Sequence, residues 1–421
     1  MRCLCLLSLC LMWTGCSDDA TPAGPGTDVA LDVAPSGDGA SETDSNASKD
    51  TATPQDSAAP QDGASCGDAA DSEEVAPPVD AAPPGDAAPP EDMATPEDVA
   101  QVEDVVQEED IATPTDVSPP DVPAAAVCEG NFKVKTAEEV AALEGCQVIT
   151  GHLQVVSNEE ITDLAALSSL TWVSGHFEVN NSNTLTDLGG LDGLNWVGGH
   201  VKIQGNEALT NLEALAGLKA AHKNLIVVAN PLLANLEGLA NLMSVAKNIR
   251  IEKNDSLTSL GGLAQVASVG GSIFVKNNSA LTSLSGLEGL GSVKGVLDIS
   301  DNGALVDLSA LSAIDSVGIK LIITSNQVLE ELVGLEGLMS AGGILIHDNG
   351  MLLSIEALSG LTMVEKDVIV LKNESLAQCL VDAWVEGIQE VGQIQGKIDI
   401  QGNNDACLCE EVNGKLHATC I

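Results

Sequence analysis

Hydrophobic and polar residues alternate in a short segment that recurs every 24 residues over the C-terminal two-thirds of the chain. In Val201-Lys-Ile203-Gln the alternation has a period of two, which predicts a strand with Val201 and Ile203 facing inward. Eleven such strands, one per repeat, would stack about 4.8 Å apart into a parallel sheet roughly 50 Å long. The inward pairs are Leu153/Val155, Phe177/Val179, Val201/Ile203, Leu225/Val227, Ile249/Ile251, Ile273/Val275, Leu297/Ile299, Leu321/Ile323, Ile344/Ile346, Val368/Val370 and Ile398/Ile400.

An asparagine follows the predicted strands with the same period. Leucines at regular positions after it fill the rest of each repeat, so a chain with 2% aromatic residues can still form a core. We expect the asparagine amides to hydrogen-bond backbone groups of their own and adjoining repeats, where the chain turns. Ser182 takes the place of the asparagine in one repeat. The asparagines of this structural ladder are Asn158, Asn206, Asn230, Asn254, Asn278, Asn302, Asn326, Asn349 and Asn373.

A fixed period of this length is typical of a solenoid, whose repeats contact only their neighbours and whose two ends need caps. Thr136-Ala-Glu-Glu139 is a capping box, which predicts a short helix that ends at Gly145. Ser375-Leu-Ala-Gln378 opens a second predicted helix, which carries Leu380 and Trp384. The expected boundaries are 128–150 for the first cap, 151–376 for the coils and 377–421 for the second cap.

Cysteines lie at both predicted caps. Cys128 and Cys146 bracket the first helix, and we expect them to pair, which fits an oxidising compartment. Four cysteines at the other end allow three pairings, of which Cys379 with Cys407 or Cys409 is favoured. Their spacing is not typical of a zinc site, because Cys407-Leu-Cys409 lacks the usual two-residue gap. These four are Cys379, Cys407, Cys409 and Cys420.

Composition changes sharply near residue 127. Of the 17 prolines, 16 precede Val127, and residues 17–127 hold 27 acidic residues against the single base Lys49. This segment cannot bury enough apolar surface to offset chain entropy, which predicts a disordered, Pro/Ala/Asp-rich acidic tether over residues 16–127. Its lone Cys66 either cross-links two chains or is incidental. The net charge of -45 argues against nucleic acid as a partner and against electrostatic docking on anionic lipid.

The first 15 residues are typical of an export signal, with Arg2 followed by a short apolar run. The run ends in Trp13-Thr14-Gly15-Cys16, which resembles a bacterial lipobox, although Trp13 stands where leucine is usual. The resemblance implies a lipid on Cys16 and a place in the bacterial cell envelope, anchored at the outer membrane and exposed on the periplasmic or the external side. An ordinary secretory signal with an incidental cysteine is the alternative.

The repeated Gly-x-Leu-x-Ile-x-x-Asn-x-x-Leu-x-x-Leu, together with Cys128-Glu-Gly130 and Val148-Ile-Thr-Gly151-His-Leu153, resembles the receptor L domain family. The resemblance spans residues 128–421. It implies a mainly β fold: a single-stranded right-handed β-helix, or leucine-rich-repeat-like solenoid, of about 24-residue coils with capping helices and disulfides. The family builds ligand-binding lobes of growth-factor receptors and occurs in bacterial surface proteins, but no kinase or transmembrane segment follows here.

The outward strand positions form a candidate binding face. They are charged and mixed in the early coils and apolar in the later ones. A contiguous apolar strip on an acidic molecule is typical of a protein contact site. The alternative is β-propensity on a surface that a loop covers. The candidate residues are Phe274, Ile322, Leu345, Ile369 and Leu371.

Three histidines, His152, His176 and His200, follow glycines at 24-residue spacing, which would stack them in one row. Such a row could hold a transition metal or sense pH. In the next two coils Asn224 and Asn248 occupy the same position. A polar residue tolerated at strand entry is therefore the alternative, and we assign no metal.

The sequence contains no Gly-rich phosphate loop, His-Glu-x-x-His pair or nucleophile motif. We therefore expect no enzymatic activity and no cofactor. The favoured function is adhesion or recognition by a lipid-anchored protein whose solenoid binds a protein or a glycan. The alternative is a structural envelope rod that self-associates through its sheet face.

Overall fold

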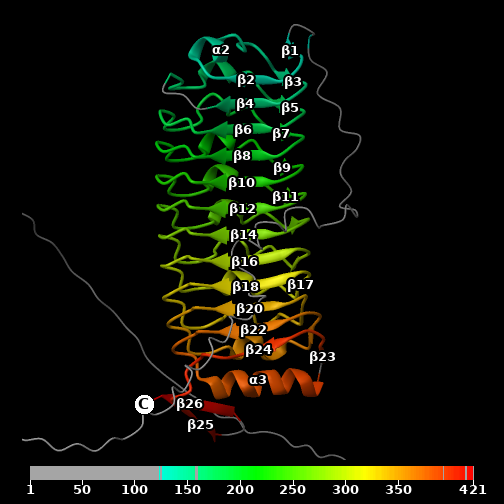
Figure 1. Ribbon diagram of the computed structural model, residues 1–421. Helices are drawn as coiled ribbons and strands as arrows, with labels where there is room; N and C mark the ends of the chain where they lie inside the picture. Colours follow the sequence, from blue (N-terminus) through cyan, green and yellow to red (C-terminus); the bar gives the residue numbers. More distant parts are fainter. Residues whose placement is uncertain (1–122, 124–125, 157–159, 392, 413–414, 421) are drawn as a thin grey trace, which may run out of the picture. The chain divides into compact units, whose positions relative to one another are not determined.

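The computed structural model describes residues 123, 126–156, 160–391, 393–412 and 415–420. Within them a long parallel sheet stacks one strand per coil in chain order, from β2 to β24 (Figure 1). The sheet has twelve strands in these residues, one more than the eleven expected, because β2 precedes the first full repeat. The strands are β2 (Phe132–Val134), β4 (Leu153–Val156), β6 (Phe177–Asn180), β8 (Val201–Gln204), β10 (Leu225–Val228), β12 (Ile249–Glu252), β14 (Ile273–Lys276), β16 (Val296–Ser300), β18 (Lys320–Thr324), β20 (Ile344–His347), β22 (Val368–Leu371) and β24 (Ile398–Asp399).

A second line of two-residue strands precedes the long strands in the coils. It forms two parallel sheets, of seven and five strands in the described residues, with a break between β13 and β15. These strands are β1 (Val127–Cys128), β3 (Val148–Ile149), β5 (Trp172–Val173), β7 (Trp196–Val197), β9 (Ala220–Ala221), β11 (Ser244–Val245), β13 (Ser268–Val269), β15 (Ser292–Val293), β17 (Ser316–Val317), β19 (Ser340–Ala341), β21 (Met363–Val364) and β23 (Gln393–Ile394). Short 3-10 helices complete several coils: η3 (Ala165–Leu167), η4 (Glu213–Leu215), η5 (Glu237–Leu239), η6 (Gly261–Leu263), η7 (Ser309–Leu311) and η8 (Glu356–Gly360).

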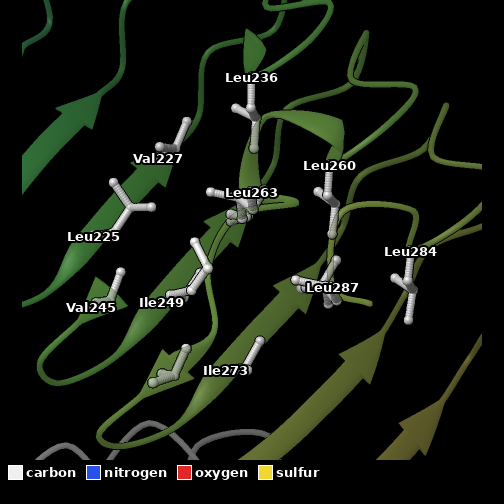
Figure 2. Close-up of a cluster of buried hydrophobic side chains, with 14 of the residues drawn as sticks. Leu225, Val227, Leu236, Val245, Ile249, Leu260, Leu263, Ile273, Leu284 and Leu287 are labelled. Carbon is white, nitrogen blue, oxygen red and sulfur yellow. The ribbon is translucent and has the colours of Figure 1, made fainter. Parts of the chain in front are cut away.

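The core is a column of Leu, Ile and Val that runs through the coils. Figure 2 shows Leu225 on β10, Ile249 on β12 and Ile273 on β14 pointing toward the leucines of the opposite side, such as Leu263 and Leu287. All five side chains are fully buried. Each buried side chain of this size contributes about 1.5–3 kcal/mol of transfer free energy, so the repetition of small aliphatic residues replaces the aromatic anchors of other cores.

A buried asparagine ladder lies beside this column. In a typical step the Asn230 backbone N–H donates to Asn254 Oδ1 at 3.1 Å, and Asn230 Nδ2 donates to the Ile203 carbonyl at 3.0 Å in the preceding coil. The series extends past Asn373 to Asn403, whose Oδ1 accepts from the Asn373 backbone at 3.2 Å. The insertion before β24 displaces Asn403 from the 24-residue period, which hid it in the sequence. Asn158 lies outside the described residues.

In the described coils, the residue before each ladder position adopts a left-handed backbone conformation. Two of these residues, Gly205 and Gly402, are glycines, but Ala229 and Lys253 both have φ of 57°. Left-handed φ costs a residue with a Cβ roughly 1–2 kcal/mol. The turn directs the next side chain, the ladder asparagine, into the interior. The buried hydrogen bonds of that asparagine offset the cost.

Helices and disulfides cap both ends. At the first end α2 (Ala137–Ala141) begins after Thr136, whose Oγ1 accepts from the Glu139 backbone at 3.2 Å, and a disulfide joins Cys128 to Cys146. The helix ends earlier than Gly145, which instead has φ of +84° in the following turn.

At the other end α3 (Gln378–Val391) packs under the last coil and carries Cys379, which is disulfide-bonded to Cys409. Cys409 belongs to an antiparallel hairpin, β25 (Cys407–Val412) and β26 (Lys415–Cys420), in which Cys407 lies opposite Cys420. Among the described helices, none is long and apolar enough to cross a membrane. Cys16, Cys66, the export signal and nearly all of the tether fall outside the described residues.

Candidate functional site

The outward face of the long sheet carries the candidate binding residues. In-register parallel pairing places equal positions of adjacent strands side by side, so each position forms a column along the coils (Figure 1). The first column is Lys133, Gln154, Glu178, Lys202, Ile226, Arg250, Phe274, Asp298, Ile322, Leu345, Ile369 and Asp399. The second is Val156, Asn180, Gln204, Val228, Glu252, Lys276, Ser300, Thr324, His347 and Leu371.

Glu178 organises the polar end of this face. Its carboxylate accepts from Gln154 Nε2 at 3.1 Å and Asn180 Nδ2 at 2.8 Å, and it lies 2.9 Å from His200 Nε2. Burial raises the pKa of Glu178, but the hydrogen bonds from His200, Gln154 and Asn180 outweigh it and hold the pKa below the usual range. The carboxylate is therefore ionised and already has its partners.

A shallow hollow of about 260 Å³ lies around this network, over β2, β4, β6 and β8. We call it the polar hollow. Its lining is polar or charged except for one aliphatic side chain. The lining residues are Lys133, Gln154, Val156, Glu178, Asn180, Asn181, Lys202 and Gln204.

Charged side chains pair with each other in the middle of the face. Arg250 Nε lies 2.9 Å from Glu252 Oε1, and the Arg250 guanidinium lies 5.9 Å from the centre of the Phe274 ring. The fully buried Asp298 accepts from Ser300 Oγ and forms an ion pair with Lys276 Nζ at 3.0 Å. These charged groups are paired with one another, so the middle of the face offers a ligand little free charge.

Three apolar side chains lie near the far end of the face, between His347 and Asp399. Leu345, Ile369 and Leu371 are half-buried neighbours on β20 and β22, and we call them the apolar patch. The prediction that Ile322 adds to this surface is wrong, because its side chain is 3% exposed. Its column neighbours are the fully buried Asp298 on β16 and the half-buried Leu345 on β20.

Phe274 does not extend the apolar patch either. Asp298 and Ile322 separate it from Leu345 along the first column, and its ring is engaged by Arg250. It belongs to the charged middle of the face.

The three histidines form a stacked row at the entry to the strands. The rings of His152 and His176 lie 4.4 Å apart and those of His176 and His200 lie 3.7 Å apart, nearly parallel in both pairs. The Nδ1 atom of His152 accepts from the His176 backbone N–H at 2.8 Å, and that of His176 accepts from His200 at 3.1 Å. Asn224 Oδ1 makes the equivalent bond to the Asn248 backbone at 3.0 Å.

This geometry favours a structural role for the row. Burial, together with the neighbouring His200 and His152 rings, lowers the pKa of His176 to about 4. The neutral His176 imidazole can then accept the backbone bond through Nδ1, which removes that lone pair from metal coordination. Within the described part of the chain, no group of three or more His, Cys, Asp or Glu side chains is placed to hold a metal ion. The hypothesis of a metal site here gains no support.

Sequence reasoning missed Lys133 and therefore the polar hollow. Lys133 lies on β2, before the first full repeat, and pairs in register with Gln154. A signal was present in the sequence: Phe132-Lys-Val134 has the strand alternation, and Asn131 stands where His152 stands in the next coil. Asn131 Oδ1 accepts from the His152 backbone at 2.8 Å, as the strand-entry residues of later coils do.

Part of the chain matches a known protein family. Residues 145–265 match the family described as Receptor L domain. Among solved structures, an internalin from Listeria monocytogenes is similar to this chain with a TM-score of 0.30 and 15% sequence identity, over 63% of this chain and 83% of that chain. No curated protein matches the sequence.

Proposed function

We propose that this protein, whose residues 145–265 match the receptor L domain family, is a non-enzymatic binding protein of the bacterial cell envelope. Its lipid is attached at Cys16, the acidic segment 16–127 is a spacer, and the solenoid binds a partner protein or glycan in adhesion or recognition. The apolar patch carries this proposal.

The apolar patch supports a protein contact for two physical reasons. Leu345, Ile369 and Leu371 are contiguous and partly open to solvent, although the chain has a net charge of -45. Removal of exposed apolar surface from water lowers the free energy of a complex, so such a surface favours binding of a partner. Lys372, which is exposed beside Leu371, adds a charged rim.

Site-specific photocrosslinking tests this contact. A photoreactive phenylalanine analogue replaces Leu371 in the full chain in cells, and the control carries it at Met363, which is 45% exposed on a short strand of the other sheet. A partner captured from position 371 and not from 363 supports binding, and Ile369→Asp should abolish that capture. Absence of any crosslink specific to position 371 contradicts the proposal.

The same experiment decides between recognition and a structural rod. If the product crosslinked at Leu371 is a second copy of this chain, the sheet face self-associates and the rod is correct. Sedimentation of the purified full chain should then show concentration-dependent assembly that Ile369→Asp removes. A monomer in solution with a distinct crosslinked partner favours recognition.

Proteolysis of intact cells tests the proposed location. Proteinase K suits this chain better than trypsin, because the only basic residue in residues 17–127 is Lys49. Loss of the solenoid from intact cells places it outside. Protection until the outer membrane is breached places it in the periplasm, and Cys16→Ser should release the chain from the membrane fraction in either case.

A further inference from the structure

We propose that the polar hollow binds an acidic saccharide, with carboxylate groups of the sugar at Lys133 and Lys202 and its hydroxyl groups at the amides between them. The inference rests on the proposed binding role, but it uses residues of β2, β4, β6 and β8 and none of the apolar patch.

The charge of the polar hollow points to an anion. Neither Lys133 nor Lys202 has an ion-pair partner among the described residues. The carboxylate of the lining, Glu178, is held by Gln154, Asn180 and His200. The lining therefore holds two lysines against one carboxylate, which is a local excess of positive charge on a chain with a net charge of -45, and such a local reversal favours a negatively charged ligand.

The side chains between the lysines point to hydroxyl groups. Gln154, Asn180 and Gln204 are amides, and each amide both donates and accepts hydrogen bonds, which matches a sugar hydroxyl. Asn180 Nδ2 donates to Glu178 Oε2, which fixes the orientation of the amide and leaves Asn180 Oδ1 buried without a partner. An unsatisfied buried acceptor costs about 1–3 kcal/mol, so a hydroxyl donor entering here would be stabilised.

The same lining disfavours an acidic peptide. Val156 is the apolar residue of the lining, and the lining contains no aromatic side chain. An apolar peptide side chain therefore has no pocket to fill. A peptide could otherwise add to the sheet as a strand. However, β4, β6 and β8 are paired on both sides. Of the four strands, β2 alone ends the sheet in the described residues, and a strand added there would lie beside the polar hollow and not over it.

Spacing along the coils sets the size of the ligand. Lys133, Gln154, Glu178 and Lys202 follow one another in the first column across four adjacent strands. Three strand spacings place the two lysine backbones roughly 14 Å apart. This separation exceeds the size of one sugar, so we expect an oligosaccharide that lies along the axis of the coils and has a carboxylate near each end.

Titration calorimetry of the full chain tests the proposal with a galacturonate trimer as the probe. Maltotriose is the neutral sugar control and tri-aspartate is the acidic peptide control. We expect binding of the trimer, weaker binding of the monomer, and no binding of maltotriose. The double variant Lys133→Met with Lys202→Met should raise the Kd of the trimer about tenfold or more. Lys219 is an exposed lysine outside the polar hollow, so Lys219→Met should leave this Kd unchanged.

Asn180→Ala separates sugar recognition from charge attraction. It should weaken binding of the galacturonate trimer and leave the affinity for tri-aspartate, if any is measured, unchanged. The proposal is wrong if the trimer fails to bind at millimolar concentration, if Lys219→Met weakens it as much as the double variant, or if tri-aspartate binds equally well. Circular dichroism of each variant excludes loss of fold, and photocrosslinking from Leu371 reports the proposed protein contact independently.

Discussion

Ser182 is the ladder position in the described coils where the asparagine side chain is missing. Its backbone N–H still donates to Asn206 Oδ1 at 2.9 Å, but its buried hydroxyl oxygen has no partner. In the next coil Asn206 Nδ2 donates to the Val179 carbonyl at 3.0 Å. Counting back by one repeat, an asparagine at position 182 would reach the carbonyl of Val155.

We therefore expect Ser182→Asn to stabilise the protein. Each new buried hydrogen bond contributes about 0.5–1.5 kcal/mol, and removal of the unsatisfied hydroxyl adds to this. Chemical denaturation should show a higher free energy of unfolding by about 1 kcal/mol or more. Ser312→Asn, at an exposed position, is the control and should change little. A destabilised Ser182→Asn variant would mean that the coil lacks room for the ladder there.

The His176 imidazole predicts a pH dependence of stability. Its pKa is lowered to about 4 in the folded state from 6.5, so the unfolded chain binds more protons between these values. The stability it contributes is complete above pH 6.5 and is lost as the pH falls toward 4. The loss at pH 5 is on the order of 1 kcal/mol after allowance for solvent screening.

Thermal melts at pH 7 and pH 5 measure this effect. His176→Asn introduces the strand-entry residue of later coils, and its stability should fall less with acid than that of the unaltered chain. His417→Asn, at an exposed position of the hairpin, should behave like the unaltered chain. Equal acid sensitivity of His176→Asn and the unaltered chain would assign the titration to other groups.

At the scale of elements, periodicity decides what a sequence can reveal. The long strands were predictable because four alternating residues with a buried pair, such as Val201 and Ile203, repeat at a fixed interval. The two-residue strands, such as Ser244–Val245, are too short to show an alternation of their own. The left-handed turn before each ladder asparagine was also invisible, because residues as different as Ala229, Lys253 and Gly205 adopt it.

The Cys379–Cys409 disulfide should hold α3 and the β25–β26 hairpin together at the second cap. Cys379 and Cys409 close a loop with a sequence separation of 30 residues, which stabilises by roughly 3–4 kcal/mol in the chain-entropy account. The double variant Cys379→Ser with Cys409→Ser should expose Val381 and Val385, which are buried at present. Hydrogen exchange should increase in α3 and in the hairpin.

Removal of the first disulfide, by Cys128→Ser with Cys146→Ser, is the matched control. Because coils contact only their neighbours, exchange should then increase near α2 and stay unchanged near α3. Faster exchange along the whole solenoid in either variant would contradict this locality.

At the scale of the whole solenoid, the coil is the unit that can be removed. Deletion of residues 237–260 joins Leu236 to Gly261, and both flanking coils keep their register because one full period is lost. We expect this variant to fold with slightly lower stability. Deletion of 237–248 removes half a period and should prevent folding, because the strand of one coil would then lie beside the turn of the next coil. Circular dichroism and gel filtration distinguish the two outcomes.

The candidate site was less predictable than the fold, because it depends on relations between coils. Leu345, Ile369 and Leu371 could be assigned to one face from their period. The burial of Ile322 did not follow from the same period, because Leu345 and Ile369 share that period and stay half-buried. The polar hollow depends on side-chain packing across β2 to β8, including a strand that precedes the repeat.

The direction of the ladder bonds has a consequence for how the chain is made. The backbone N–H of Asn206 donates forward to Asn230, and the same direction holds up to the bond from Asn373 to Asn403. A ribosome delivers the N-terminal coils first. Several backbone N–H groups at the ends of the long strands, such as those of Val201 and Gly205, also donate forward to the next coil. The last coil to emerge therefore lacks its ladder bond and its strand bonds until the next coil folds onto it. A chain whose synthesis stops early keeps these donors of its last coil unpaired. In the full chain, Asn403 accepts the bond from Asn373 and completes the ladder.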